Sequence, residues 1–174
     1  MAHESQISFL LQVKASMPEK FKNCRVLDIG SLDLNGNNRY LFEDYKYLGV
    51  DIGYGNNVDL VCRGHEINDT HGFDVVISTE CFEHDEFWVE TLKNMIKLTK
   101  SNGLMLFSCA TTGRPEHGTT GTSPSDSPFT NGYYKNLTIS DIDSEINIRN
   151  YFKEYKFISQ TNPSCDLYFW GIKK

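Results

Sequence analysis

Two acidic residues stand within or at the end of short apolar segments, where a carboxylate can bind a polar ligand. Asp28 lies inside CRVLDIG, residues 24–30, and Asp51 ends YLGVD, residues 47–51. An acid at the end of a second strand can accept both hydroxyl hydrogens of a ribose. An acid inside an apolar strand needs hydrogen-bond donors to offset its burial. Asp51 is therefore a candidate for ribose binding, whereas Asp28 binds loop amides and a ligand amino group or is a purely structural anchor.

The loop after the first apolar segment does not suit a pyrophosphate. A dinucleotide loop reads G-x-G-x-x-G, and the equivalent positions here are Gly30, Leu32 and Asn35. Leu32 would obstruct the approach of phosphates to the backbone, and Asp33 would repel them. These residues disfavour a nicotinamide dinucleotide. A cationic ligand with an adenosine end and no phosphate, such as S-adenosylmethionine, fits better.

Histidines and tyrosines further along the chain could act on a second substrate. His84 follows a long apolar segment, and His117 lies in a polar segment rich in Gly, Ser and Thr. Histidine titrates near neutral pH, so either residue could deprotonate or orient an acceptor oxygen or nitrogen. The alternative is that His84 packs at a helix entry and that His117 is a mobile surface residue. Tyr133 and Tyr134 either line an acceptor pocket or hold the loop against the core.

Short apolar segments predict the strands that position these residues. They are separated by helical or loop segments, which is the pattern of an open, mainly parallel sheet. Ligands of such sheets bind beyond the carboxyl ends of the strands. The last two segments flank a TNPS turn and predict an antiparallel hairpin. The predicted strands are 24–30, 47–51, 58–62, 73–79, 104–110, 155–160 and 166–172.

Apolar spacing and capping residues predict three helices. The first covers residues 4–17. The second starts at a capping Asp85 and stops at Asn102-Gly103, and the third starts at a capping box of Thr138 and Asp141. The apolar stripe of the first helix comprises Ile7, Leu10, Val13 and Met17.

These elements predict an α/β fold. We expect a doubly wound, Rossmann-like, mostly parallel sheet with a C-terminal antiparallel hairpin, arranged as three α/β/α layers. Residues 1–174 should form a single domain, with an N-terminal helix within residues 1–20. The composition of residues 111–135 predicts a mobile loop, and its position after the fifth predicted strand favours a lid over the acceptor site; the alternative is an ordinary disordered insert.

Composition and charge exclude several classes of protein. The chain has 174 residues and a net charge of −6, which argues against binding to duplex nucleic acid. No apolar segment approaches transmembrane length, and the start MAHESQ does not resemble a signal peptide, so we expect a cytoplasmic protein without membrane contact. The five cysteines are widely spaced without a CxxC, which predicts buried thiols and not disulfides or zinc ligands.

Three segments together resemble a known family. VLDIGSLDLNGNNR, YLGVDIGYGNNVDLV and FDVVISTECFEHDEFW occur in this order. They resemble the class I S-adenosylmethionine-dependent methyltransferases, and in particular the small branch whose first motif reads IGS-x-D-x-NG. A later YYKNLT is similar to the DYWRFT segment of the same branch. The resemblance extends from about residue 24 to residue 142 and implies S-adenosylmethionine as the cofactor.

The resemblance also implies roles for individual residues. Glu83 and His84 match the end of the LEH triplet of the family, which places Glu83 at the acceptor. Where the family often has an acid that contacts the adenine amino group, this chain has Arg63, which cannot accept a hydrogen bond; Glu66 or a backbone carbonyl would have to replace it. The residues implied at the cofactor are Asp28, Gly30, Ser31, Asn35, Gly36, Asp51, Ile52 and Glu80.

The expected activity is transfer of a methyl group to an oxygen or nitrogen of a small molecule or saccharide. We expect His84 and His117 to be catalytic, and Glu83, Tyr133 and Tyr134 to bind the acceptor. The pocket for the acceptor would be built from the loop, the N-terminal helix or a second copy in a homodimer. Nothing in the sequence calls for a metal ion. The alternatives are a catalytically silent cofactor-binding subunit, a protein or nucleic-acid methyltransferase, and a nicotinamide-dependent oxidoreductase.

Overall fold

Seven strands form one sheet in the order β3-β2-β1-β4-β5-β7-β6. The computed structural model describes residues 3–130 and 132–174; Met1, Ala2 and Asn131, which fall within the predicted domain and lid, lie outside the described residues. The strands are β1 (Arg25–Ile29), β2 (Lys46–Asp51), β3 (Leu60–Val61), β4 (Phe73–Thr79), β5 (Thr99–Ala110), β6 (Phe152–Gln160) and β7 (Asp166–Lys173).

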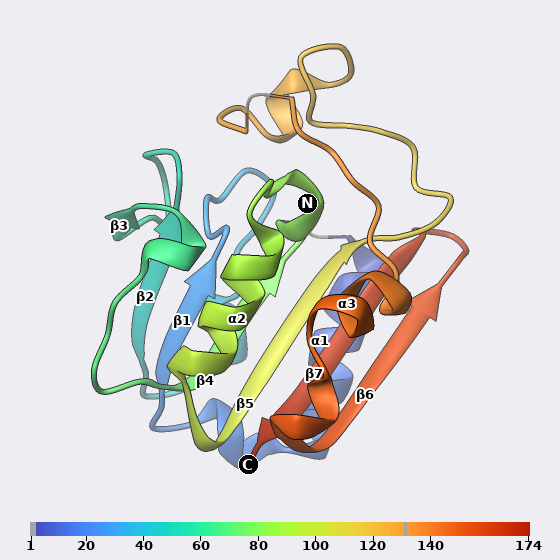
Figure 1. Ribbon diagram of the computed structural model, residues 1–174. Coiled ribbons are helices and arrows are strands. Elements are labelled where there is room, and N and C mark those ends of the chain that lie inside the picture. The colour runs from blue at the N-terminus through green and yellow to red at the C-terminus, as the bar shows by residue number, and fades with distance from the viewer. Residues whose placement is uncertain (1–2, 131) are drawn as a thin grey trace.

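The first five strands run parallel, and β7 runs antiparallel to both β5 and β6. The predicted mostly parallel sheet with a C-terminal hairpin is therefore confirmed. The strand order reverses between β1 and β4, so the carboxyl ends of these two strands form a switch point where the loops diverge. In Figure 1 the long loop after β5 rises above this end of the sheet.

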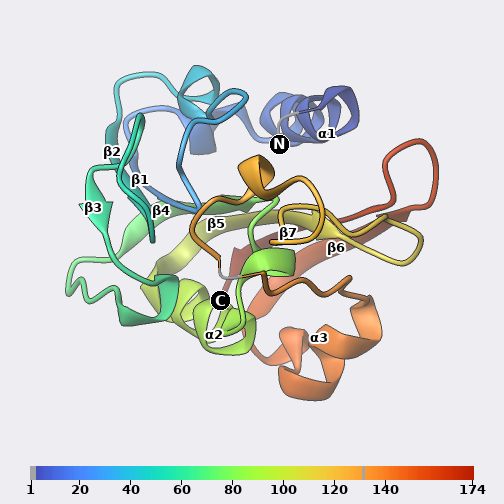
Figure 2. The ribbon, with the colours of Figure 1, turned by 90° about the horizontal axis from the view of Figure 1, so that it is seen from above.

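Helices cover both faces of the sheet, as Figure 2 shows from above. One face packs against α1 (Glu4–Ser16), and the other packs against α2 (Trp88–Leu98) and α3 (Ile139–Glu145). Each interface buries an apolar cluster, and the three-layer prediction is confirmed. Short 3-10 turns complete the connections: η1 (Pro18–Phe21), η2 (Arg39–Leu41), η3 (Gly64–Glu66), η4 (Phe82–His84), η5 (Pro124–Asp126) and η6 (Ile148–Asn150).

Two details of the helices differ from the sequence prediction. The second helix does not extend to Asn102-Gly103; it ends at Leu98, and β5 starts directly at Thr99. The predicted stripe of α1 is also partly wrong, because Ile7 is 36% exposed whereas Phe9 is buried. Ile7 instead borders the cavity described below. The capping box of α3 is present as predicted, since Thr138 and Asp141 exchange hydrogen bonds.

No helix within residues 3–130 and 132–174 combines the length and the apolar character needed to cross a membrane. All five cysteines are free thiols; two are buried and three are partly exposed, so the prediction of buried thiols holds only for Cys24 and Cys109.

Candidate active site

A cavity of about 310 Å³ lies beyond the carboxyl ends of β1, β2 and β4. This is the place where the reversal of strand order leaves room for a ligand. The structure brings together all eight residues implied at the cofactor, since each of them lines this cavity: Asp28, Gly30, Ser31, Asn35, Gly36, Asp51, Ile52 and Glu80.

The turn after β1 requires glycine. Gly30 has a φ of 77°, and a β-carbon there would lie 2.6 Å from the Cβ of Cys81. An L-residue would therefore be strained and would collide with the chain after β4. The amides of Gly30 and Ser31 both donate to the carbonyl of Val50, which ties the turn to β2. This arrangement keeps the floor of the cavity open to a ligand.

Asp33 stabilises the loop that follows. Its carboxylate accepts hydrogen bonds from the amide of Gly36 at 2.7 Å and from Nδ2 of Asn37 at 2.8 Å. The acid that makes the loop unsuitable for phosphates thus has a local structural role, because it closes the turn that presents Asn35 and Gly36 to the cavity.

Asp51 ends β2 and faces the same cavity. Its Oδ2 accepts the amide hydrogen of Leu32 at 3.1 Å, and its Oδ1 accepts that of Gly53 at 3.0 Å. Each oxygen keeps one lone pair for a ligand hydroxyl. Burial raises the pKa of Asp51 above its ordinary value, and the backbone donors act in the opposite direction. A ribose diol would supply the donors that this carboxylate still lacks.

Asp28 is buried and only partly hydrogen-bonded. Its Oδ2 accepts from the hydroxyl of Tyr47 and, at 3.2 Å, from Nδ2 of Asn38. Its Oδ1 is buried without a partner among the described residues. Burial raises its pKa to about 7 despite these two donors. The sequence reading had Asp28 order the loop amides; the amide of Leu32 instead donates to Asp51, and the partners of Asp28 are side chains.

Glu80 also lines the cavity and follows β4 directly. Its φ of 52° is uncommon for a residue with a side chain, and such strain concentrates at functional sites. Ser108 Oγ donates to its Oε1 at 2.7 Å, while its Oε2 lacks a hydrogen bond and has Arg114 Nη2 at 4.0 Å. Asp28 Oδ1 thus has no partner among the described cavity residues, whereas Arg114 already lies within ion-pair distance of Glu80 Oε2; the unpartnered oxygen of Asp28 is the one that favours a cationic ligand.

The end of the cavity near β3 is lined by Ile52, Cys62, Arg63 and Gly64. The guanidinium of Arg63 lies over the ring of Phe87, 4.7 Å from its centroid, and 3.4 Å from a carboxylate oxygen of Glu86. These contacts hold its charge against the helix entry.

Glu66, one candidate for the missing acid at this end, is exposed and accepts the backbone amide hydrogen of Arg63. Its carboxylate therefore caps η3. A backbone carbonyl is the remaining candidate partner for an adenine amino group.

The loop after β5 covers more of the cavity than expected from the sequence. Residues 126–130 line the cavity beside Asp51, and the ring of Phe129 packs on Gly53 so closely that a β-carbon there would lie 1.9 Å from it. From the sequence this loop was expected over the acceptor alone, and a role for Phe129 at the cavity was not predicted. Its only signal was an isolated aromatic in a polar segment, which does not reveal a partner distant in the chain.

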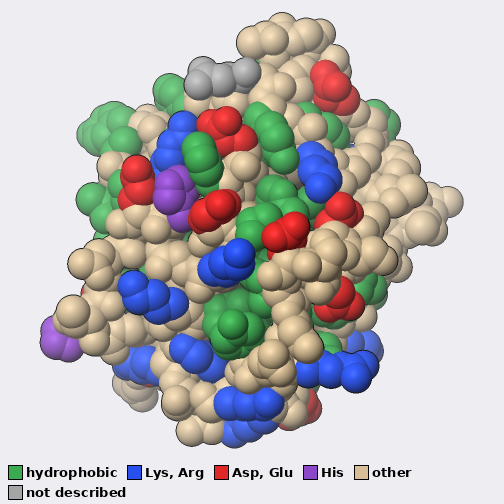
Figure 3. All heavy atoms as spheres, in the orientation of Figure 1, with side chains coloured by type: hydrophobic (Ala, Val, Ile, Leu, Met, Phe, Trp, Pro, Cys, Tyr) green, Lys and Arg blue, Asp and Glu red, His purple; other side chains and the backbone are tan. Residues whose placement is uncertain are grey.

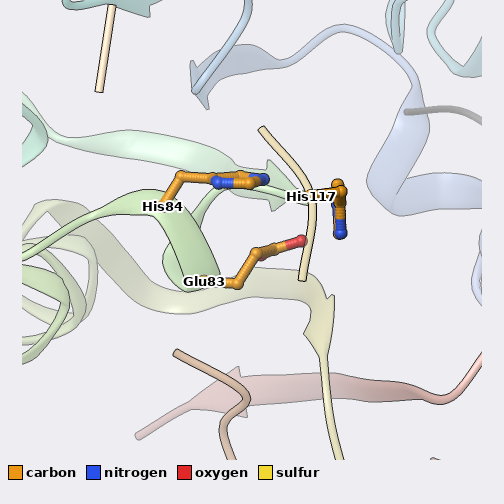
Figure 4. Close-up of side chains that lie close together, drawn as sticks. All are labelled: Glu83, His84 and His117. Atoms are coloured by element: carbon orange, nitrogen blue, oxygen red, sulfur yellow. The ribbon is translucent and has the colours of Figure 1, made fainter. Parts of the chain in front are cut away.

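Four of the five residues predicted to act on the acceptor lie together at the border of the cavity. His84 lines the cavity, and Glu83, His117 and Tyr134 lie next to His84. The ring centroids of His84 and His117 are 5.0 Å apart, and that of Tyr134 is 5.5 Å and 5.1 Å from them. Figure 4 shows Glu83 and His84 extending from η4 toward His117 on the loop. Tyr133 is partly exposed and is not among the residues that line the cavity.

Burial sets the protonation of this cluster. Burial, followed by repulsion from His117, lowers the pKa of His84 to about 4, so its imidazole is neutral at neutral pH. Burial, followed by repulsion from Glu80, raises the pKa of Glu83, whose carboxylate is fully inaccessible to solvent. A neutral imidazole beside the cavity can accept a proton or donate a lone pair. The same three side chains bring one donor atom each to within 4.8 Å of one another, which is close enough to consider a metal ion.

Acidic side chains predominate at the cavity end of the face in Figure 3, and Lys and Arg side chains gather toward the opposite end. On this face the charge distribution favours a cationic ligand at the cavity.

No protein-family model matches the sequence, and the search of curated protein sequences found no match. Solved structures of similar fold do exist. A 1,6-didemethyltoxoflavin-N1-methyltransferase from Burkholderia thailandensis, with bound 1,6-didemethyltoxoflavin and S-adenosylhomocysteine, superposes with a TM-score of 0.64 at 11% identity, over 100% of this chain and 92% of that one.

The N-terminal domain of EvdMO1, determined in the presence of S-adenosylhomocysteine and D-fucose, gives a TM-score of 0.64 at 14% identity, over 100% of this chain and 85% of that one. TehB from Haemophilus influenzae superposes with a TM-score of 0.65 at 15% identity, over 96% of this chain and 62% of that one. At these identities the similarity is one of fold, and the chain shares the fold of methyltransferases.

Proposed function

We propose that the protein is an S-adenosylmethionine-dependent methyltransferase acting on an oxygen or nitrogen of a small molecule or saccharide. The observation that carries this proposal is the set of three carboxylates at one cavity. Asp51 suits the ribose, the unpartnered oxygen of Asp28 suits the amino group of the cofactor, and Glu80, whose charge Arg114 partly offsets, adds negative charge near the sulfonium. A pyrophosphate would meet repulsion from all three.

The comparisons support the same cofactor. The Burkholderia enzyme and the EvdMO1 domain share this fold and were crystallised with S-adenosylhomocysteine, the product of methyl transfer. The first of these contains a small heteroaromatic acceptor, and the second was studied with a sugar. Both precedents favour a small acceptor for this chain.

The proposed reaction is an in-line displacement. The acceptor atom attacks the methyl carbon of the sulfonium, the carbon–sulfur bond breaks, and S-adenosylhomocysteine leaves. The protein contributes mainly by positioning the two reactants. We assign His84 and His117 to bringing the acceptor atom to the methyl group, with Glu83 and Tyr134 supporting them and Tyr133 at the outer rim. Closure of residues 126–130 would exclude water during transfer.

Incubation with methyl-labelled S-adenosylmethionine and a panel of phenols, amines, heteroaromatics and saccharides tests this function. We expect labelled product with at least one small acceptor. Labelling of protein or nucleic acid alone would contradict the acceptor class. Cofactor binding without any transfer, including in the presence of cell extract, would identify a silent cofactor-binding subunit, the second candidate function.

A further inference from the structure

Three polar atoms in the cluster of Glu83, His84 and His117 are buried without a hydrogen-bond partner in the described part of the chain. Within residues 3–130 and 132–174, neither carboxylate oxygen of Glu83 nor Nδ1 of His84 has one. Glu83 is 0% exposed and His84 is 7% exposed. A single unpaired buried polar atom is costly, and a buried carboxyl group with neither oxygen hydrogen-bonded is rare. The cluster therefore lacks a group that can serve all three atoms at once.

His117 is already oriented as a metal ligand would be. Its Nδ1 lies 3.1 Å from the carbonyl oxygen of Pro115, to which it can donate a hydrogen bond. With the proton on Nδ1, the lone pair is on Nε2. A backbone carbonyl that fixes the tautomer in this way is the usual partner of a metal-binding histidine. The backbone of Glu83 is held too, because its carbonyl accepts the amide hydrogen of Lys135 at 2.8 Å.

A second cluster in the molecule serves as a comparison. His3, Glu80 and Asp166 also bring donor atoms together, but their charges are already matched. His3 Nε2 lies 2.9 Å from Asp166, and Arg114 lies 3.3 Å from Asp166 and 4.0 Å from Glu80. That cluster contains its own cation, which a metal ion would have to displace. Around Glu83 no ion pair occurs among the described residues.

From these contacts we propose that Glu83, His84 and His117 bind one divalent first-row transition-metal ion. Two imidazoles and one carboxylate suit such an ion better than Ca²⁺ or Mg²⁺, which favour sites made of oxygen ligands. Ligands about 2.1 Å from an ion lie roughly 3 to 3.5 Å apart. The observed donors lie within 4.8 Å of one another, so modest rotations of the side chains would bring them to the ion.

Three protein ligands leave coordination positions for a substrate. Because His84 also lines the cofactor cavity, the ion would lie at the border between the cavity and the acceptor region. An acceptor oxygen or nitrogen bound to the ion would lose its proton more readily. This use of the ion rests on the proposed function, whereas the binding of the ion does not. A metal site could not be predicted from the sequence, because adjacent Glu83 and His84 lack a recognisable ligand spacing and His117 is distant along the chain.

Binding of Mn²⁺ to the metal-stripped protein tests the proposal without cofactor or acceptor. Mn²⁺ is chosen because free cysteines prefer softer ions. Electron paramagnetic resonance of unbound Mn²⁺ should reveal one saturable site per chain, with a dissociation constant above the micromolar range because Mn²⁺ binds such sites most weakly among the first-row divalent ions. His117→Ala and Glu83→Gln should each weaken Mn²⁺ binding by at least roughly 10- to 100-fold, the loss of metal affinity found when even the residues that support metal ligands are changed. His71→Ala and Glu145→Gln change exposed residues and should bind as the wild type does.

His117→Ala alters a loop residue, so its effect can be read even if Glu83→Gln disturbs folding, which circular dichroism would reveal. Absence of a saturable site in the wild type would overturn the proposal. So would unchanged affinity in both variants, or a loss caused by His3→Ala instead. A parallel titration with S-adenosylhomocysteine separates this failure from failure of the proposed function, because that titration reports the cofactor cavity alone.

Discussion

The cofactor side and the acceptor side of the site are built in different ways. On the cofactor side, the turn after β1 is fixed by backbone hydrogen bonds to β2, including those from Gly30 and Ser31 to Val50. On the acceptor side, Glu83 and His84 meet His117 only because a long loop folds back over the sheet. The first half depends on neighbouring strands and the second on packing between distant segments. Changes on the cofactor side should therefore alter binding, and changes on the acceptor side should alter turnover.

The largest separation between the two sides is expected from His84→Ala. In the proposed reaction His84 brings the acceptor atom to the methyl group, so its loss should lower turnover by roughly 10²- to 10⁴-fold. The affinity for S-adenosylhomocysteine, measured by calorimetry, should stay the same. His71→Ala, an exposed histidine, provides the control. Full activity of the His84 variant would show that His84 only packs.

Asp51→Ala should have the converse effect on binding. Removing the carboxylate would leave two ribose hydroxyls without their charged partner, at a cost of about 1–3 kcal/mol, or roughly 5- to 150-fold in the dissociation constant. Calorimetric titration with S-adenosylhomocysteine measures this. Asp143→Ala, an exposed acid on α3, should change nothing. An affinity equal to that of the wild type would remove Asp51 from the ribose site.

The pH dependence of S-adenosylhomocysteine binding tests whether Asp28 must be ionised to bind the ligand. Burial raises its pKa to about 7 in the free protein, whereas a ligand ammonium group needs it ionised. Affinity for S-adenosylhomocysteine should therefore increase as the pH rises through 7, by about tenfold between pH 6 and 8. The stability of the free protein changes in the opposite direction to this affinity. Because the pKa of Asp28 is raised in the folded protein, its contribution to the free energy of unfolding is lost as the pH rises through that pKa. Asp28→Asn should flatten the binding profile, and a persistent slope in that variant would assign it to another group.

The smallest effect is expected from Phe129→Ala, at the adenosine end of the cavity. Loss of the aromatic contact should weaken the binding of S-adenosylmethionine and of S-adenosylhomocysteine equally. The dissociation constants should rise roughly 3- to 10-fold, the range for about 1 kcal/mol of aromatic packing. Tyr54→Ala, an aromatic that is 85% exposed near Gly53, is the matched control. Equal losses in both variants would point to a general change in the loop.

The same comparison explains what could be predicted from the sequence. Strands and turns close together in the chain have local signals, so the parallel strands, the hairpin and the cavity position of Asp51 followed from apolar runs and spacing. The predicted end of α2 at Asn102-Gly103 was wrong because the residues before this helix-stop signal belong to β5. Their pairing with β4, and not a local signal, ends the helix at Leu98. Ile7 faces the cavity border, so its apolar character does not mean core burial.

The contacts of the long loop could not be predicted. The packing of Phe129 on Gly53 and the meeting of His117 with Glu83 depend on how residues 111–130 fold over the sheet. Their composition predicts only a polar loop, because no periodic pattern records a partner so far along the chain.

The most direct test of the central claim is calorimetric titration of the purified protein with S-adenosylmethionine and S-adenosylhomocysteine, alongside NAD⁺. The three carboxylates at the cavity predict saturable binding of both sulfur compounds, in the micromolar range with one site per chain, and no binding of NAD⁺. Binding of NAD⁺, or no binding of either sulfur compound to a protein shown by circular dichroism to be folded, would contradict the account.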